Sequence, residues 1–171
     1  FPTLPVLSPT SGKLVGGTNL TITGSGFISG ATVTIGSQPC TSVIVTSSTS
    51  MSCVTPTMSA GSYDLTITNP DLQSVTLGNG YKYNAFPTVA SVSPTNGRLS
   101  GTNSLTITGT GFITGASVTV GGSTCASPVV SGGGTTITCG APAKTVGTYS
   151  ISVTNFDTQG DTLSSAYTYN P

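Results

Sequence analysis

The chain has 171 residues, of which only 4 are Lys or Arg and 4 are Asp or Glu, and it contains neither His nor Trp. The formal net charge of +0 leaves no basic face that could neutralise the phosphates of a nucleic acid. No apolar run approaches the roughly 20 residues that a membrane-spanning helix needs. Ser and Thr supply about a third of the residues, and this bias favours β-strands and turns over helices.

The sequence repeats itself once. LTITGSGF at residues 20–27 returns as LTITGTGF at residues 105–112, an offset of 105 − 20 = 85. A fixed internal period indicates tandem copies of one module. We therefore expect two domains, residues 1–85 and 86–171, which the register suggests were cut from a longer array.

The second copy carries one extra residue. The two copies align at an offset of 85 through their opening segments, but Cys53 aligns with Cys139 at 139 − 53 = 86. The simplest place for the insertion is the run Gly132–Gly134.

Within each copy the expected elements are short strands separated by turns. Pro2, Pro5 and Pro9 restrict the opening to an extended edge segment, which residues 8–12 end in a turn. Apolar residues then alternate with polar ones, and a period of two predicts strands with one buried face. The alternating residues of the first copy are Leu20, Ile22, Val33, Ile35, Val43, Val45, Met51, Cys53, Tyr63, Leu65, Ile67, Val75, Leu77, Tyr81 and Tyr83. Roughly seven short strands per copy predict an antiparallel β-sandwich, and no segment predicts a helix.

The 4 cysteines fall two to a copy. Three connectivities are formally possible, and the simplest pairs Cys40 with Cys53 and Cys125 with Cys139, because each domain then carries the same disulfide. Closing such a loop stabilises a domain by about 3 kcal/mol in the chain-entropy model, and it implies an extracellular location. The alternative is two free buried thiols per copy. Zinc is a poor fit, because the chain lacks His and a paired C-x-x-C spacing.

The sequence offers no catalytic centre. Without His or Glu the chain cannot form a Ser-His-Asp or Cys-His set. Its only carboxylates are Asp64, Asp71, Asp157 and Asp161, and two of them, Asp71 and Asp157, fall in matching turns where Asp is expected for local backbone hydrogen bonds. Asp157 with Asp161 supplies too few oxygens for calcium. We predict no enzyme activity, no bound metal and no cofactor.

Several motifs recur in the same order in both copies: Ser-Pro-Thr-x-Gly from residue 8, Gly-x-Gly-Phe from residue 24, and a closing Tyr-x-Tyr from residue 81. This order resembles the IPT/TIG domain, an immunoglobulin-like family, over nearly the whole of both copies. One departure is Gly101-Thr102-Asn103-Ser104, where the family pattern has Gly-Gly-Thr. The resemblance implies an all-β chain of two tandem immunoglobulin-like antiparallel β-sandwiches. It also implies a cell-surface receptor, a bacterial surface protein, an accessory module of a carbohydrate-active enzyme or a transcription factor, without choosing among them.

Two features are candidates for function. Asn19-Leu20-Thr21 matches the N-glycosylation sequon, which makes Asn19 a candidate site, and the Ser and Thr residues of the outer strand faces are candidate O-glycan acceptors. The second feature is the junction Tyr83-Asn84-Ala85-Phe86-Pro87, which joins the copies with almost no linker. A Pro and flanking aromatic residues favour a stiff or narrowly hinged connection.

These observations favour a structural role over a binding role. The first hypothesis is a segment of an extracellular or cell-surface rod or fibre, coated with covalent glycans, whose partners are neighbouring repeats of the same protein in a self-assembly. Exposed sheet edges offer a lateral contact. The second hypothesis is the ectodomain of an adhesin or receptor whose loops recognise a protein or a carbohydrate. Neither hypothesis involves nucleic acid or insertion into a membrane.

Overall fold

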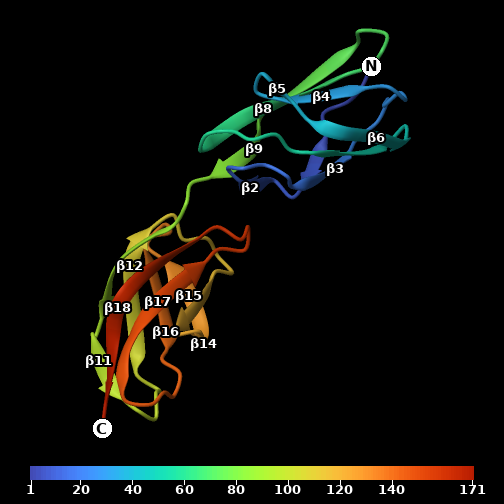
Figure 1. The fold of residues 1–171 in the computed structure, drawn as a ribbon. Helices are drawn as coiled ribbons and strands as arrows, with labels where there is room; N and C mark the ends of the chain where they lie inside the picture. Colours follow the sequence, from blue (N-terminus) through green and yellow to red (C-terminus); the bar gives the residue numbers. More distant parts are fainter. The chain divides into compact units, whose positions relative to one another are not determined.

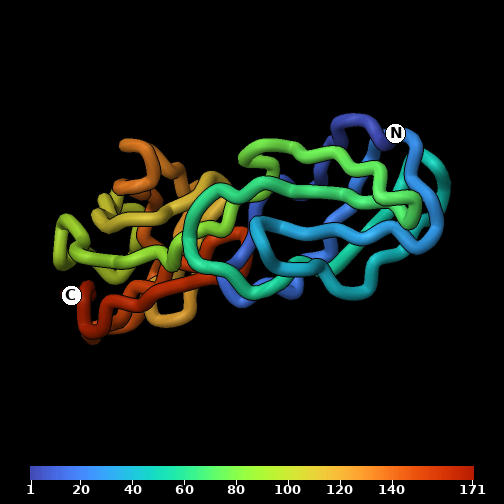
Figure 2. The backbone as a smooth tube through the Cα atoms, turned by 90° about the horizontal axis from the view of Figure 1, so that it is seen from above, coloured from blue at the N-terminus to red at the C-terminus, as the bar shows by residue number.

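The computed structural model describes residues 1–171 and contains strands but no helices (Figure 1). The chain divides into two compact units, unit 1 from Phe1 to Ala85 and unit 2 from Phe86 to Pro171. Figure 2 shows that the backbone leaves unit 1 once and does not return to it. Each unit is therefore built from one contiguous stretch of chain. Because the structure contains no helices, it contains no helix that could span a membrane.

Unit 1 contains two sheets. Its strands are β1 (Val6–Ser8), β2 (Ser11–Lys13), β3 (Asn19–Thr23), β4 (Thr32–Ile35), β5 (Gln38–Pro39), β6 (Thr41–Ser47), β7 (Ser50–Val54), β8 (Gly61–Thr68) and β9 (Ser74–Asn84). One sheet has the order β1-β3-β7-β6 and the other the order β2-β9-β8-β4-β5. All pairs are antiparallel except β2 with β9. The all-β class and the immunoglobulin-like sandwich expected from the sequence are confirmed.

Unit 2 repeats this plan. Its strands are β10 (Thr88–Ser93), β11 (Asn96–Arg98), β12 (Ser104–Thr110), β13 (Ser117–Val120), β14 (Ser123–Thr124), β15 (Ala126–Ser131), β16 (Thr136–Gly140), β17 (Gly147–Thr154) and β18 (Gly160–Asn170). The sheets have the orders β10-β12-β16-β15 and β11-β18-β17-β13-β14. Equivalent strands occupy equivalent places, so the internal repeat of the sequence is a repeat of topology.

The strand count is higher than the sequence predicted. The predicted turn at residues 8–12 is wrong at its end, because Ser11–Lys13 forms β2 and adds to the open edge of β9 in parallel. The last two apolar pairs of the first copy, Val75 with Leu77 and Tyr81 with Tyr83, lie on a single long strand, β9, and not on two separate strands. Asn79 interrupts the alternation at φ 50°, and its N–H donates to Asp64 Oδ1 at 2.8 Å, which keeps the strand attached to β8.

Backbone hydrogen bonds show where the extra residue of unit 2 lies. The N–H of Phe27 donates to the Ser48 carbonyl, and the N–H of Phe112 donates to the Gly134 carbonyl. Ser48 and Gly134 are therefore equivalent at 134 − 48 = 86. Because the two cysteines that precede these hairpins, Cys40 and Cys125, differ by 85, the insertion lies in the β15–β16 hairpin or just before it.

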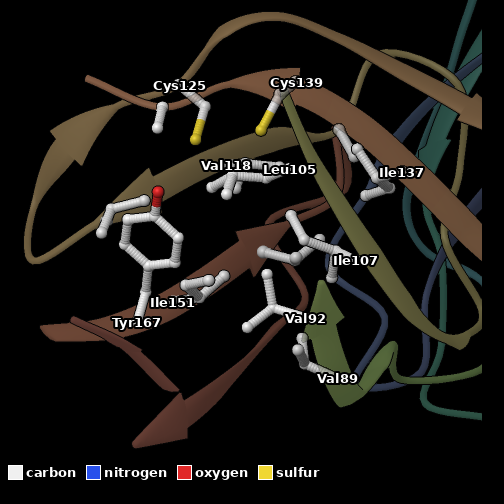
Figure 3. Packing of buried hydrophobic residues seen from close by; sticks show 14 of the residues in the cluster. Val89, Val92, Leu105, Ile107, Val118, Cys125, Ile137, Cys139, Ile151 and Tyr167 are labelled. Atoms are coloured by element: carbon white, nitrogen blue, oxygen red, sulfur yellow. The ribbon is translucent and has the colours of Figure 1, made fainter. Parts of the chain in front are cut away.

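Each unit has its own apolar core between its two sheets. Alternating residues of every long strand point inward, and Leu20, Ile22, Leu65 and Ile67 are fully buried in unit 1. Figure 3 shows the same layer in unit 2, where Leu105, Ile107, Ile137 and Ile151 are labelled. The opposite faces of these strands carry mostly Ser and Thr. The alternation read from the sequence is therefore the alternation between core and surface.

Tyrosines fill one end of each core, the end at which the last strand of the unit finishes. Tyr81 and Tyr83 of β9 are buried and their rings meet edge to face at 5.1 Å, and Tyr83 also meets Tyr63 of β8 at 5.8 Å. The Tyr83 hydroxyl donates to the Pro56 carbonyl at 2.8 Å. Gly12 must be glycine because a Cβ there would overlap the Tyr81 hydroxyl. The Tyr-x-Tyr motif thus fixes the β7–β8 loop and β2 against the end of the core.

Candidate functional site

The two cysteines of each unit lie together inside the core. Cys40 follows β5, and its N–H donates to the Val33 carbonyl at 2.9 Å, whereas Cys53 lies on β7 in the opposite sheet. All four cysteines are buried free thiols in this structure. Figure 3 shows the sulfur atoms of Cys125 and Cys139 pointing toward one another. The sequence-predicted pairs are thus the pairs that the fold brings together.

The thiols within a pair influence each other. The hydrogen bond between the two sulfur atoms raises the pKa of Cys53 and of Cys139, as does their burial, and it lowers the pKa of Cys40 and of Cys125. All four thiols are buried, so a substrate in solution does not reach them. The folded pair is therefore suited to a structural role.

A buried asparagine clamps one end of each sandwich, and the sequence analysis did not predict this role. The Asn69 side chain donates to the Gly26 carbonyl at 2.8 Å and accepts from the Ile28 N–H at 3.2 Å. Asn155 makes the same two bonds to Gly111 and Ile113, at 2.8 and 3.0 Å. The clamp joins the β8–β9 turn to the Gly-x-Gly-Phe loop about 40 residues away in sequence. Recurrence at an offset of 86 was the only sequence signal for it.

All four carboxylates accept hydrogen bonds from backbone N–H groups, Asp64 from the Asn79 N–H described above. Asp71 and Asp157 each accept from the N–H two residues later at 3.1 Å, which confirms the turn interpretation of both residues. Asp161 accepts from the Val89 N–H at 2.7 Å and so ties β10 to β18. No group of three or more His, Cys, Asp or Glu side chains that could hold a metal ion occurs anywhere in residues 1–171.

The glycosylation candidate is accessible. Asn19 begins β3, is exposed, and pairs with Val54 on the sheet formed by β1, β3, β7 and β6. In unit 2 the equivalent strand begins at Ser104, so the equivalent position cannot carry an N-linked sugar. The sequence-predicted site is thus confined to one unit.

The junction is as short in the structure as in the sequence. Strand β9 ends at Asn84 and β10 begins at Thr88, so Ala85, Phe86 and Pro87 are the only residues between them. Tyr83, Asn84 and Pro87 are buried, whereas Ala85 and Phe86 are exposed.

Comparison with known proteins decides the family. The model of the IPT/TIG domain matches residues 2–83 and again residues 87–170. This chain belongs to the IPT/TIG domain family. The two matches follow the two sandwiches almost residue for residue, and the resemblance stated from the motifs is confirmed.

The IPT/TIG chain is similar to segments of much longer proteins. It is 34% identical to human fibrocystin-L over 99% of its own length and 4% of that protein. It is 37% identical to the contact site A protein of Dictyostelium discoideum over 57% of its own length and 19% of that protein. The extracellular region of plexin A4 shares its fold with a TM-score of 0.62, at 20% identity over 99% of this chain and 18% of that one. These relatives are extracellular or cell-surface proteins, and the chain is a tandem IPT/TIG segment of that extracellular type.

The asparagine clamp generates a prediction. Replacing Asn69 with Ala removes both bonds and leaves the Gly26 carbonyl and the Ile28 N–H without partners. We expect the free energy of unfolding of unit 1 to fall by about 2–3 kcal/mol in urea denaturation. The matched control is Asp71→Ala, two residues later in the same turn, which removes one exposed bond and should cost about 1 kcal/mol or less. Equal losses in the two variants would contradict the clamp.

Proposed function

We propose that this IPT/TIG chain is a non-catalytic structural segment of an extracellular or cell-surface rod or fibre. The observation that carries the proposal is that two self-contained sandwiches follow each other with only Ala85, Phe86 and Pro87 between strands. Strand direction supports it, because the chain enters each unit at one end of the sandwich and leaves at the other. Repeats joined in this way gain length by contacting only their neighbours. The short junction, from Tyr83 to Pro87, supports a stiff or narrowly hinged connection.

The state of the carboxylates supports a role without catalysis. Asp71, Asp157 and Asp161 are engaged by backbone N–H groups of their own unit. A general acid or base needs a carboxyl group that can reach a substrate and exchange its proton. The chain has no His or Glu to take over that function.

We further propose that Cys40 with Cys53, and Cys125 with Cys139, form one disulfide in each unit. Each reaction joins two sulfur atoms, releases two protons and passes two electrons to a disulfide-containing oxidant of the export route, which is reduced to a dithiol. The proximity of the sulfur atoms supports this pairing. Their burial means that the oxidant must act before the sandwich closes.

Oxidation has a measurable consequence. Protein recovered from its natural extracellular source should have an intact mass about 4 Da below that of the tetrathiol. Reduction should lower the free energy of unfolding of each unit by about 3 kcal/mol. The variant Cys40→Ala/Cys53→Ala should lose this response in unit 1 and keep it in unit 2. Alkylation of all four cysteines in denaturant without reductant would contradict the disulfides.

The outer faces support glycan attachment. They present Ser and Thr in cross-strand pairs, such as Thr66 with Thr76, whose hydroxyls lie 2.9 Å apart, and Ser152 with Thr162 at 2.8 Å. Asn19 adds one N-linked candidate on the other sheet of unit 1. Because a surface with so few charges gives little protection against nonspecific association, a sugar coat would keep such a rod soluble.

A second candidate function is the ectodomain of an adhesin or receptor that recognises a protein or a carbohydrate. The similarity to the contact site A protein favours it. In this role the loops at one end of a sandwich would make the contact.

Microscopy with mass spectrometry separates the two functions. For the structural role we expect the native material to form long fibres whose repeat matches two domains. We also expect a mass per chain above 16.9 kDa, with the excess explained by hexose. The Asn19→Gln variant should lose any N-linked part of that excess and keep the rest. Isolated short particles of bare mass that bind a glycan array would contradict the fibre and favour the receptor.

A further inference from the structure

Strand β6 forms an open edge of unit 1. It is the last strand in the order β1-β3-β7-β6, so one of its sides has no neighbouring strand (Figure 1). Its sequence, TSVIVTS, contains no charged residue and no proline. Val43 and Val45 pack against the core of unit 1, whereas Ile44 is 57% exposed. An uncharged edge of this kind, with an exposed apolar residue at its centre, is able to pair with a further strand.

The other edge strands lack this combination of features. β5 and β14 have two residues each, and β2 and β11 have three residues each and end in Lys13 and Arg98. β1 has three residues and lies between Pro5 and Pro9. β10 exposes no large apolar side chain. Short strands, charges and prolines are features by which proteins protect their sheet edges against further pairing.

Strand β15 is the equivalent of β6 in unit 2, and it contains a proline. Pro128 stands where β6 has Val43, at an offset of 128 − 43 = 85. Proline has no N–H to donate to a further strand. Val129, the equivalent of Ile44, is nevertheless 58% exposed. The two units thus expose a similar apolar side chain on an edge that is open in unit 1 and protected in unit 2.

The order of residues in β6 indicates which strand fits this edge. Counted outward from Ile44, both directions meet a valine first and then two Ser or Thr residues. Two copies of β6 can therefore pair antiparallel about Ile44 with every residue opposite one of its own kind, and no charges meet. Only self-pairing makes use of this symmetry, so it favours a second copy of this chain over an unrelated extended segment.

The regular part of β6 is its apolar centre. Ile44 and Val45 pair in register with Ser52 and Met51 of β7, and register shifts lie on either side of these two residues. A contact through so few residues buries less than the roughly 1,200 Å² of a standard interface. We therefore expect a weak association, with a dissociation constant on the order of 1 mM.

We propose that β6 pairs antiparallel with β6 of a second copy of this chain, about a two-fold axis at Ile44. The two β1-β3-β7-β6 sheets then form one continuous sheet, and both copies use the same surface. The inference rests on the proposed function, since neighbouring segments of a fibre bring a second copy alongside, and it names the surface between them. The contact lies along the side of unit 1 and involves neither end of the chain.

A cysteine in place of Ile44 makes the pairing measurable. Directly opposed residues of antiparallel strands lie about 4.5–5.5 Å apart, which is close enough for a disulfide. Two thiols then join, release two protons and pass two electrons to oxidised glutathione, which becomes two molecules of reduced glutathione. The 171-residue chain with Ile44→Cys should form a covalent dimer, which non-reducing gels measure over time.

Two matched cysteine variants control for accessibility and register. Val129→Cys places the thiol at the equivalent, equally exposed position of β15, beside Pro128. Thr46→Cys places it on β6, but about 13 Å along the strands from its own copy in the proposed register, too far for a disulfide. We expect Ile44→Cys to dimerise at least about tenfold faster than either control.

Exchanging the proline between the units tests the cause. Val43→Pro added to Ile44→Cys should slow dimerisation to the control rate, and Pro128→Val added to Val129→Cys should raise it. Unit 2 already accommodates proline at this position of the strand, and thermal unfolding checks that both variants stay folded. Equal rates in Ile44→Cys and Val129→Cys, fast dimerisation of Thr46→Cys, or a rate that Val43→Pro leaves unchanged would each overturn the contact.

The outcomes separate this inference from the fibre role. The fibre role depends on whether the native material is fibrous. Native fibres together with slow dimerisation of Ile44→Cys would overturn the β6 contact and keep the fibre role. Fast dimerisation together with native particles that are not fibres would keep the contact and overturn the fibre role.

Discussion

Each unit depends on burying one face of each of its two sheets against the other. Each unit of about 85 residues forms one hydrophobic core between its sheets, and core residues such as Leu20, Ile67 and Ile151 are completely buried. A domain of this size buries a limited fraction of its surface, so it gains much from any extra cross-link. The paired cysteines lie inside this core, whereas the clamps at Asn69 and Asn155 lie at one end of it, where strands are joined by loops. The clamps therefore add hydrogen bonds at an end where the packing of the core stops.

Because each hydrophobic core is formed by residues of one unit only, units can follow each other in tandem without depending on a neighbour for their core. The outer faces are then free to carry Ser and Thr. Unit 2 differs from unit 1 inside the core, where Ile151 replaces Leu65 and Val153 replaces Ile67, and also in the loops. Lys144, for example, lies 4.9 Å from the Tyr149 ring, where unit 1 has Met58, and both backbone N–H groups bind the equivalent Leu carbonyl. Loop substitutions of this kind change the surface of a unit without changing its core.

Strand alternation made the fold predictable from sequence, since a period of two places Leu65 and Ile67 on one face whatever the rest of the chain does. The two domains could be predicted because equivalent residues recur along the chain at offsets of 85 and 86. Strand β2 was missed because Ser11–Lys13 has no apolar alternation and becomes a strand only through its pairing with β9. The Asn69 clamp was missed because its partners are 41 and 43 residues away, a distance that local patterning cannot register.

The central claim is that the chain is two self-contained sandwiches in series. Stretching single chains between their termini tests it most directly. The account predicts two separate unfolding events, each releasing about 300 Å of chain in the reduced protein and less after oxidation, because a disulfide withholds its loop. One event of double length would contradict the claim, since it would mean that neither unit holds its core alone.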